Sequence, residues 1–237
     1  MKKIIGGLTL LFFIFSAPAF AAELKVVTEN WKPYNYEENG VIKGNSTKIV
    51  KAVLDNAQIP YDIKVYQWTE AYEIAQKEAD TLIYTINRTP QRENLFKWAS
   101  SLGRDIQYSL YRLKKNDHII PTSLNEAKKY KIGSQKDASG DIWLKSQSVP
   151  NVVASVKLEE TVKKLFNGKV DLIIAASNII TAIKKAGFNP DEAVAVLPVF
   201  QTTPYMALSL STSDEVLNKI QESYDALLKD NKIKIDK

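Results

Sequence analysis

Polar side chains that could bind an anion follow the apolar run at residues 82–86. This run is rich in β-branched and aromatic residues, a composition that predicts a buried strand. Five polar or charged residues lie at or just after the end of that strand: Thr85, Asn87, Arg88, Thr89 and Arg92. Open α/β sheets bind ligands beyond the carboxyl ends of their strands, and a guanidinium there is a fork of donors that fits a carboxylate. The sequence therefore predicts a binding site for small anionic or zwitterionic solutes.

The chain is poor in the residue types that enzymes and metal sites use. It has no cysteine and a single histidine, His118, which lies in a charged stretch without spaced acidic or histidine partners. A Ser–His–Asp set, a thiol nucleophile and a zinc–thiolate site are therefore not expected. No pair of acids has a spacing that by itself suggests glycoside hydrolysis. We predict a binding protein with no catalytic residues, no metal and no cofactor.

The first 21 residues have the pattern of a secretory signal peptide. Lys2 and Lys3 precede an apolar run at residues 4–15, and the small residues Ala19 and Ala21 follow it. A membrane anchor is the alternative, but the run is short for crossing a bilayer. We predict a signal peptide at 1–21 and a mature protein exported to the periplasm.

The charge balance gives no reason to expect a nucleic-acid partner. The formal net charge is +5, and the basic residues are scattered and mostly interleaved with acids. Nucleic-acid binding needs a concentrated basic patch. We therefore predict no such partner.

Strand-like and helix-like segments alternate along the chain, which predicts an α/β fold. One set of strand–helix units precedes residue 110, a second follows residue 120, and the last strands and helix return to the first set. The predicted first lobe comprises residues 22–112 and 201–237, and the second comprises residues 113–200. Two crossings, near 113–117 and 197–203, would form a hinge, and a cleft between hinged lobes captures small ligands.

Short stretches of the chain carry a resemblance to a known family by their order and spacing. They are Thr28-Glu29-Asn30-Trp31-Lys32-Pro33-Tyr34-Asn35-Tyr36, Gly40-Val41-Ile42-Lys43-Gly44, Thr89-Pro90-Gln91-Arg92 with Phe96-Lys97-Trp98, and Gly168-Lys169-Val170-Asp171. Through them the sequence is similar to the family 3 extracellular solute-binding proteins, the receptors of polar amino acid uptake transporters. The resemblance implies a two-lobe periplasmic-binding-protein-like fold of type II, with the ligand cleft between lobes joined by a two-strand hinge.

The resemblance also implies how a carboxylate would be held. Arg92 matches the arginine that grips the ligand α-carboxylate, and Ser139 matches a second-lobe hydroxyl that caps it. Thr85, Asn87 and Thr89 match the small polar positions that assist the arginine. Ligand binding would then join the two lobes through one charged group.

Other positions of the cleft follow from the same resemblance. Trp31 matches the aromatic residue that stacks over the ligand side chain, Trp68 lies near a second aromatic wall, and Glu29 matches an acid at the cleft rim. Arg88 lies close to another residue of the same sign, so it belongs either to a diffuse anion site or to a structural pair. Both readings of Arg88 stay open from the sequence.

One departure from the family pattern affects the ligand. The family places an acid for the ligand ammonium after the strand at 170–175, but here Ala176 stands there, followed by Ser177. A buried ammonium without a carboxylate partner is costly. Either Glu29 or Asp137 takes the role, or the ligand has no α-ammonium, and Ser177 is expected to close on the ligand with its loop.

These observations predict an exported solute-binding protein that captures a small carboxylate-bearing solute, an amino acid or a related organic acid. It would deliver this ligand to the permease of an ABC-type uptake transporter and act as a monomer. The alternatives are a periplasmic enzyme on the same fold, such as a dehydratase using Glu29 or Asp137, and a ligand-sensing module. The identity of the ligand and of the permease stays open.

Overall fold

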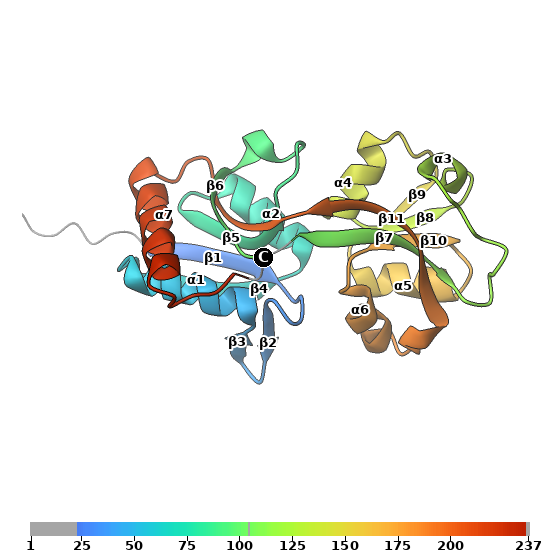
Figure 1. Ribbon diagram of the computed structural model, residues 1–237, viewed down its shortest axis with the longest axis horizontal. Coiled ribbons are helices and arrows are strands. Elements are labelled where there is room, and N and C mark those ends of the chain that lie inside the picture. Colours follow the sequence, from blue (N-terminus) through green and yellow to red (C-terminus); the bar gives the residue numbers. More distant parts are fainter. Residues whose placement is uncertain (1–22, 104, 236–237) are drawn as a thin grey trace, which may run out of the picture.

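The computed structural model describes residues 23–103 and 105–235 and contains two α/β lobes, each built on a five-stranded sheet (Figure 1). The predicted signal peptide at 1–21 lies outside these residues. Within the two described ranges, no helix is long and apolar enough to cross a membrane.

The first lobe is built on a sheet with the strand order β4-β1-β5-β12-β6. Its strands are β1 (Leu24–Glu29), β4 (Tyr61–Tyr66), β5 (Thr81–Asn87), β6 (Lys97–Ser101) and β12 (Pro204–Leu208). Strand β5 is buried at every position, as its apolar sequence predicts. Strands β4, β1 and β5 are parallel, so their carboxyl ends meet at one edge of the sheet.

Helices cover both faces of the first sheet. Helices α1 (Asn45–Asn56) and α7 (Asp214–Lys229) pack on one face, and α2 (Trp68–Lys77) packs on the other. A short hairpin of β2 (Tyr36–Glu38) and β3 (Val41–Lys43) projects from this lobe (Figure 1). Apolar residues at helical spacing produce this arrangement, because they place one stripe of each helix on the sheet.

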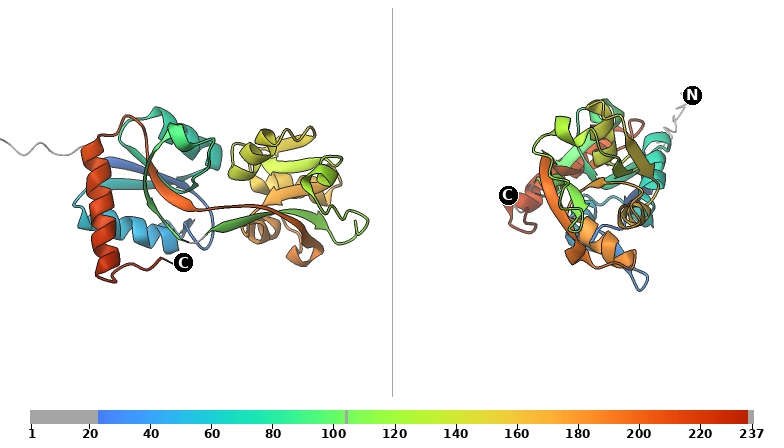
Figure 2. Two further views of the ribbon diagram at one scale, coloured as in Figure 1. Left: turned by 45° about the horizontal axis from the view of Figure 1, so that its top comes forward. Right: turned by 90° about the vertical axis from the view of Figure 1, so that its right-hand side faces the viewer.

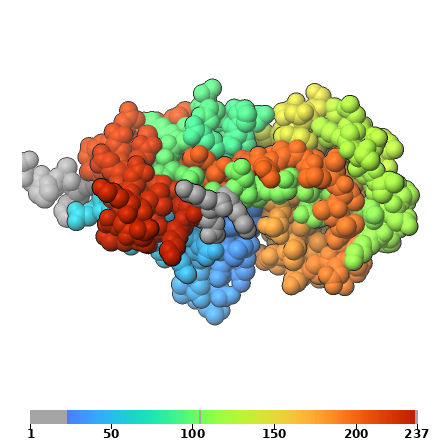
Figure 3. Space-filling view, in the orientation of Figure 1, coloured from blue at the N-terminus to red at the C-terminus, as the bar shows by residue number. Residues whose placement is uncertain are grey.

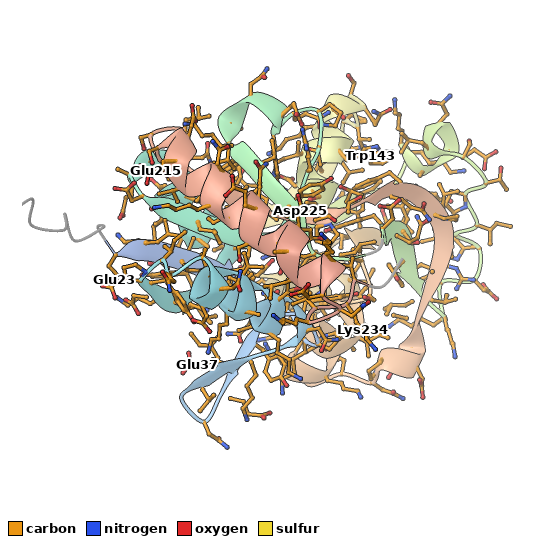
Figure 4. The ribbon with its side chains drawn as sticks, turned by 60° about the vertical axis from the view of Figure 1, so that its left-hand side comes forward. Glu23, Glu37, Trp143, Glu215, Asp225 and Lys234 are labelled. Carbon is orange, nitrogen blue, oxygen red and sulfur yellow. The ribbon has the colours of Figure 1, made fainter. Side chains whose placement is uncertain are left out.

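Helix α7 illustrates the amphipathic pattern. Its residues Ile220, Tyr224 and Leu227 are buried in the core of the first lobe. Glu215 and Asp225 lie on its exposed side, which faces the viewer in Figure 4. The Ser213 hydroxyl caps the helix by accepting a hydrogen bond from the backbone N–H of Val216.

The second lobe has the strand order β11-β7-β10-β8-β9. Its strands are β7 (Ile106–Leu113), β8 (Ile132–Gln135), β9 (Val152–Ser155), β10 (Leu172–Ala175) and β11 (Ala193–Thr202). Its helices are α3 (Leu124–Ala127), α4 (Ser139–Ser146), α5 (Leu158–Phe166) and α6 (Ile179–Lys185). The described residues also form two short 3-10 helices, η1 (Glu93–Leu95) and η2 (Pro190–Glu192). Strands β9, β8 and β10 are parallel, so their carboxyl ends also share one edge.

Strands β7 and β11 form the connection between the lobes. They pair in antiparallel orientation, and Figures 2 and 3 show them running together from one lobe to the other. The chain enters the second sheet between Ser101 and Ile106 and leaves it after Thr202. The first crossing predicted near 113–117 is therefore wrong, because β7 belongs to the second sheet. An apolar pattern indicates that a strand is buried, but it does not indicate which sheet the strand joins.

Candidate ligand-binding cleft

The two lobes line a partly open cavity of about 340 Å³. It lies where the carboxyl ends of the parallel strands of one lobe face those of the other. The first lobe contributes residues at or after the ends of β1 and β4, including Glu29, Trp31 and Trp68. The second lobe contributes residues at or after the ends of β8, β9 and β10, namely Gln135, Lys157, Leu158, Glu159, Asn178, Thr181, Ala182 and Lys185. Open α/β sheets bind ligands beyond the carboxyl ends of their strands, and this cavity lies at that position for both lobes.

Two tryptophans form aromatic walls of this cavity. Trp31 and Trp68 are each only 4% exposed. Trp31 packs with the hydrophobic core of the second lobe, so the lobes are in contact through this ring. Trp68 begins α2 and stacks on Tyr72 with 5.5 Å between ring centroids. The indole N–H of each tryptophan is buried and has no acceptor among residues 23–103 and 105–235.

Arg92 lies in a buried cluster that bridges the lobes beside this cavity. Its Nη1 donates to the backbone oxygen of Asn87 at 3.0 Å and to Oγ of Ser139 at 3.2 Å. Its Nη2 donates to the backbone oxygen of Asp137 at 2.8 Å. The Asn87 amide also donates to Ser139 and to the Tyr108 hydroxyl, both at 3.0 Å. We call Asn87, Arg92, Tyr108 and Ser139 the interlobe cluster.

The Arg92 guanidinium carries an uncompensated charge. The residue is fully buried, and the structure gives it no ion-pair partner within the described part of the chain. Burial lowers the pKa of Arg92. Its Nε has no acceptor there, and the guanidinium lies over the rings of Trp68 and Tyr72, 5.1 and 5.0 Å from their centroids. Arg92 does not itself line the cavity, whereas Trp68, whose ring lies against the guanidinium, does.

The backbone around the cluster is held in unusual conformations. Thr85 has φ of 60°, a left-handed value that is costly for a β-branched residue. It is an extra residue in β5, because Tyr84 pairs with Met206 and Ile86 with Tyr205. The Thr85 hydroxyl is buried without a partner among the described residues. Strain of this kind is common beside functional sites.

The buried acid Asp141 fixes the backbone of Asp137, whose carbonyl accepts from Arg92. Asp137 has φ of 58°, and its backbone N–H donates to Asp141 Oδ2 at 3.0 Å. Asp141 is fully buried and also accepts from the Ser134 hydroxyl at 2.7 Å. The Asp137 carbonyl is therefore held in place toward Arg92. The Asp137 side chain lines neither this cavity nor a second, smaller cavity of about 20 Å³, which adjoins the first at Glu29, Trp31 and Asn178.

Glu29 is the acid of the first-lobe wall. It is half-buried at the end of β1, and its Oε2 accepts from Gln135 of the second lobe at 3.3 Å. Burial is the main reason that its pKa rises to about 7, with a further contribution from Glu159, while Gln135, Arg92 and Lys185 act in the opposite direction. Glu159 lies 3.6 Å from Lys185. Glu29 can therefore hold or release a proton near neutral pH.

Of the ten predicted site residues, Glu29, Trp31 and Trp68 line the cavity, and the other seven, Arg88 and Ser177 among them, do not. Arg88 forms an ion pair with Glu93, and its guanidinium lies over the rings of Trp98 and Tyr205, 5.4 Å from each centroid. This geometry favours a structural pair for Arg88. Ser177 is exposed and lines neither cavity. Helix α6 begins at Ile179 after Asn178 and has no side-chain cap.

Thr89 supports the arginine without reaching the cavity. It is 9% exposed, and its backbone oxygen accepts from the N–H of Arg92 at 3.0 Å. Its hydroxyl has no partner in the described residues.

Ala176 is fully buried in the hydrophobic core of the second lobe.

Several residues of the cleft were missed by the sequence reasoning. Tyr108, Gln135 and Asn178 belong to the second lobe, and Asn178 lines both cavities with a buried, unpartnered side-chain oxygen. A signal for two of them existed, since Gln135 ends β8 and Asn178 follows β10 closely. The rule used for the end of β5 would have found these residues had it been applied to the second lobe. Among the described residues, no group of three or more His, Cys, Asp or Glu could hold a metal ion.

Comparisons with known proteins place this cleft in context. A model of the bacterial extracellular solute-binding proteins, family 3, matches residues 24–234. A histidine kinase sensor domain with similarity to periplasmic binding proteins superposes with a TM-score of 0.78 at 14% identity, covering 90% of this chain and 93% of its own. A search of curated proteins gave no match.

Amino-acid-binding proteins superpose nearly as well. ArtJ, an arginine-, lysine-, histidine-binding protein from Geobacillus stearothermophilus, gives a TM-score of 0.72 at 17% identity, covering 89% and 91% of the two chains. An ancestral arginine-binding protein bound to arginine gives 0.73 at 21% identity, covering 90% and 95%. At these identities the likeness establishes the fold alone. The predicted two-lobe periplasmic-binding-protein-like fold is confirmed.

Proposed function

The chain belongs to the bacterial extracellular solute-binding proteins, family 3, and from this membership we propose that it captures a small carboxylate-bearing solute between its lobes. It would deliver the loaded ligand to the permease of an ABC-type uptake transporter. In this role it would be exported by the signal peptide predicted at 1–21 and act as a monomer in the periplasm.

The buried charge of Arg92 is the observation that carries this proposal. A buried cation without an anionic partner is costly, and the described residues offer Arg92 only two backbone oxygens and one hydroxyl. A ligand carboxylate would supply the missing charge and would accept two N–H groups in the fork geometry that guanidinium favours. The cleft thus favours an anionic group near Arg92.

Ser139 is suited to complete the carboxylate site from the second lobe. Its Oγ accepts from both Arg92 and Asn87, so its own hydroxyl proton remains available to donate. We propose that, when the lobes separate, the ligand carboxylate takes the place of Ser139 and the Asp137 carbonyl on the guanidinium. Closure then returns Ser139 to the carboxylate and expels water, which strengthens the ion pair. Ligand capture and lobe closure would therefore use the same group.

Ligand sensing is the alternative use of the same capture step. The similarity to a histidine kinase sensor domain favours it over an enzyme. Both roles require the closed, ligand-bound form. They differ in whether a permease or a signalling partner recognises that form. Vesicles carrying a candidate permease would distinguish them, because solute uptake should depend on this protein only in the transport role.

A ligand screen tests the capture step. We expect the mature protein to be stabilised by at least one carboxylate-bearing solute in a thermal-shift panel of amino acids, dicarboxylates, aromatic acids and neutral sugars. Ligand at a hundred times its dissociation constant stabilises the folded state by about 2.7 kcal/mol. Native mass spectrometry of the purified protein should show the same solute bound. A panel in which neutral sugars stabilise and every carboxylate fails would overturn the proposal.

A further inference from the structure

A hydrogen bond between two cavity-lining residues joins the lobes, and its acceptor is a carboxyl group. Oε2 of Glu29, the last residue of β1, accepts from Nε2 of Gln135, the last residue of β8, at 3.3 Å. Both residues also line the smaller cavity. Strand β1 belongs to the first lobe and β8 to the second, so separation of the lobes breaks this bond. It also moves the half-buried Glu29 carboxyl into solvent.

Within residues 23–103 and 105–235, no cation lies close enough to Glu29 to form an ion pair. Three charged groups act on its carboxyl from other elements: Glu159 of α5, Lys185 of α6 and Arg92 of the loop after β5. Lys185 lies 3.6 Å from Glu159, so its charge is already partly balanced. Arg92 is held by hydrogen bonds within the interlobe cluster. An ionised Glu29 carboxyl is therefore poorly compensated while the lobes are closed.

The protonation of Glu29 changes near neutral pH. Burial is the main cause that raises its pKa to about 7, whereas its carboxyl in open solvent would keep a pKa near 4.5. Lys32 and Asp141 are already paired, with Glu38 and Lys145, and burial raises the pKa of Tyr108 to about 12. The titratable residues that line the two cavities with Glu29 are Lys32, Tyr66, Tyr108, Asp141, Lys157, Glu159 and Lys185.

We propose that Glu29 and Gln135 form a proton-controlled latch, in which a proton on the Glu29 carboxyl holds the empty lobes closed and its release favours opening. The protonated carboxyl can both accept from the Gln135 amide and donate to it, whereas the ionised carboxyl can only accept. The closed form binds this proton more tightly than the open form, because opening solvates the carboxylate. Closure due to this group is therefore present at pH 5 and lost as the pH rises through 7. The latch acts in the protein without ligand and so goes beyond the proposed function.

Single-molecule energy transfer between the lobes tests the latch. The chain has no cysteine, so Gln76→Cys in α2 and Asn151→Cys before β9 would carry one dye on each lobe. Both residues are exposed and line neither cavity. In mature protein shown by native mass spectrometry to be free of ligand, we expect the ratio of open to closed molecules to rise at least tenfold between pH 5 and pH 8. One unit of pKa difference between the two forms corresponds to about tenfold in this ratio.

Glu29→Gln tests whether the response comes from this carboxyl, because glutamine keeps the size of the side chain and cannot ionise. The ratio of open to closed molecules should then stay constant from pH 5 to pH 8, near the wild-type value at pH 5. His118→Gln is the matched control, because His118 is the single histidine of the chain and lies exposed in the segment before α3. Its ratio should follow the wild type at every pH. A Glu29→Gln variant that keeps the wild-type pH dependence would overturn the latch.

The wild-type titration decides the proposal even if a variant folds poorly. A rise of less than tenfold, or a larger open fraction at pH 5 than at pH 8, would overturn the latch. Either result would leave the proposed function standing, because ligand capture is tested separately by the thermal-shift panel. Failure of every carboxylate in that panel would in turn overturn the proposed function and leave the latch standing, since the energy-transfer measurement uses no ligand.

Discussion

The interlobe cluster and the cavity wall lie between the same two lobes, but they differ in how many of their polar groups are hydrogen-bonded within the protein. In the cluster, Arg92 and Asn87 donate to Ser139 and to other atoms of the protein, so the lobes are joined by hydrogen bonds. On the wall, the indoles of Trp31 and Trp68 stay without acceptors among the described residues. Under the proposed function, the cluster would bind one anionic group and change with lobe closure, whereas the wall would select the rest of the ligand. Affinity should therefore depend mainly on the cluster and selectivity mainly on the wall.

Removing the charge of Arg92 should have the largest effect on binding. Truncating one partner of a buried ion pair costs roughly 3–5 kcal/mol, so Arg92→Gln should weaken carboxylate binding by about a hundredfold or more. The unliganded protein should keep its stability to within about 1 kcal/mol, since the variant also removes an uncompensated buried charge. Calorimetry and urea unfolding measure the two quantities.

The matched control for this variant is Arg88→Gln. Arg88 is exposed and paired with Glu93, and exposed pairs contribute about 0–1 kcal/mol. Its ligand affinity should equal that of the wild type. The distinction between cluster and wall would be lost if the Arg92→Gln variant unfolded at the same urea concentration as the wild type and bound ligand with the same affinity. Arg92 would then be a structural donor whose charge does not matter for binding.

Glu29 should show the next largest effect, in stability as a function of pH. The pKa of Glu29 rises from 4.5 to about 7 on folding, so between these values the folded protein holds a proton that the unfolded chain has released. Stability from this group is thus present at pH 5 and lost as the pH rises through 7. Relative to the wild type, Glu29→Gln should be stabilising by about 2 kcal/mol at pH 8, a figure discounted for partial exposure, and nearly neutral at pH 5. Urea unfolding at several pH values measures this difference in unfolding free energy between the variant and the wild type. A difference that stays constant with pH would contradict the raised pKa.

Ser139→Ala should have a smaller effect, confined to the cluster. It removes the acceptor shared by Arg92 and Asn87 and the hydroxyl proposed to cap the carboxylate. Affinity should fall by about tenfold, the usual consequence of losing one hydrogen bond to a charged group. Ser146→Ala in the same helix is the control, since Ser146 is exposed and bonds only local atoms. A similar loss in both variants would point to α4 as a whole and away from the cluster.

The sequence predicted the first-lobe half of the cleft better than the second-lobe half. The apolar run of β5 identified the strand whose end carries Asn87 and leads to Arg92, because complete burial leaves a clear pattern. Strand β8 has only four residues and no such run, so the signal for Gln135 at its end was weaker than the signal at the end of β5. Tyr108 was missed because β7 was assigned to the first lobe. Pairing between strands distant in the sequence decides that assignment, and apolar patterns do not record pairing.

The position of Arg92 relative to the cavity also could not come from the sequence. Its placement at the lobe junction follows from the end of β5, but the Trp68 ring that separates it from the cavity belongs to α2. Contacts between side chains of different elements depend on packing that short motifs do not encode. The resemblance supplied the role expected of Arg92, and the structure supplied its neighbours.

Thr85 should give the smallest effect and the one most specific to the backbone of the cluster. A threonine at φ of 60° is strained by about 1–2 kcal/mol, and glycine takes this conformation without a steric cost. Because the Thr85 hydroxyl has no partner among the described residues, Thr85→Gly should stabilise the unliganded protein by about 1 kcal/mol in urea unfolding. Thr81→Gly, at a buried position of the same strand without positive φ, should destabilise it instead. If Thr85→Gly also weakens ligand binding, the threonine hydroxyl belongs to the binding machinery; if affinity is unchanged, the bulge serves only to aim the residues that follow it toward Arg92.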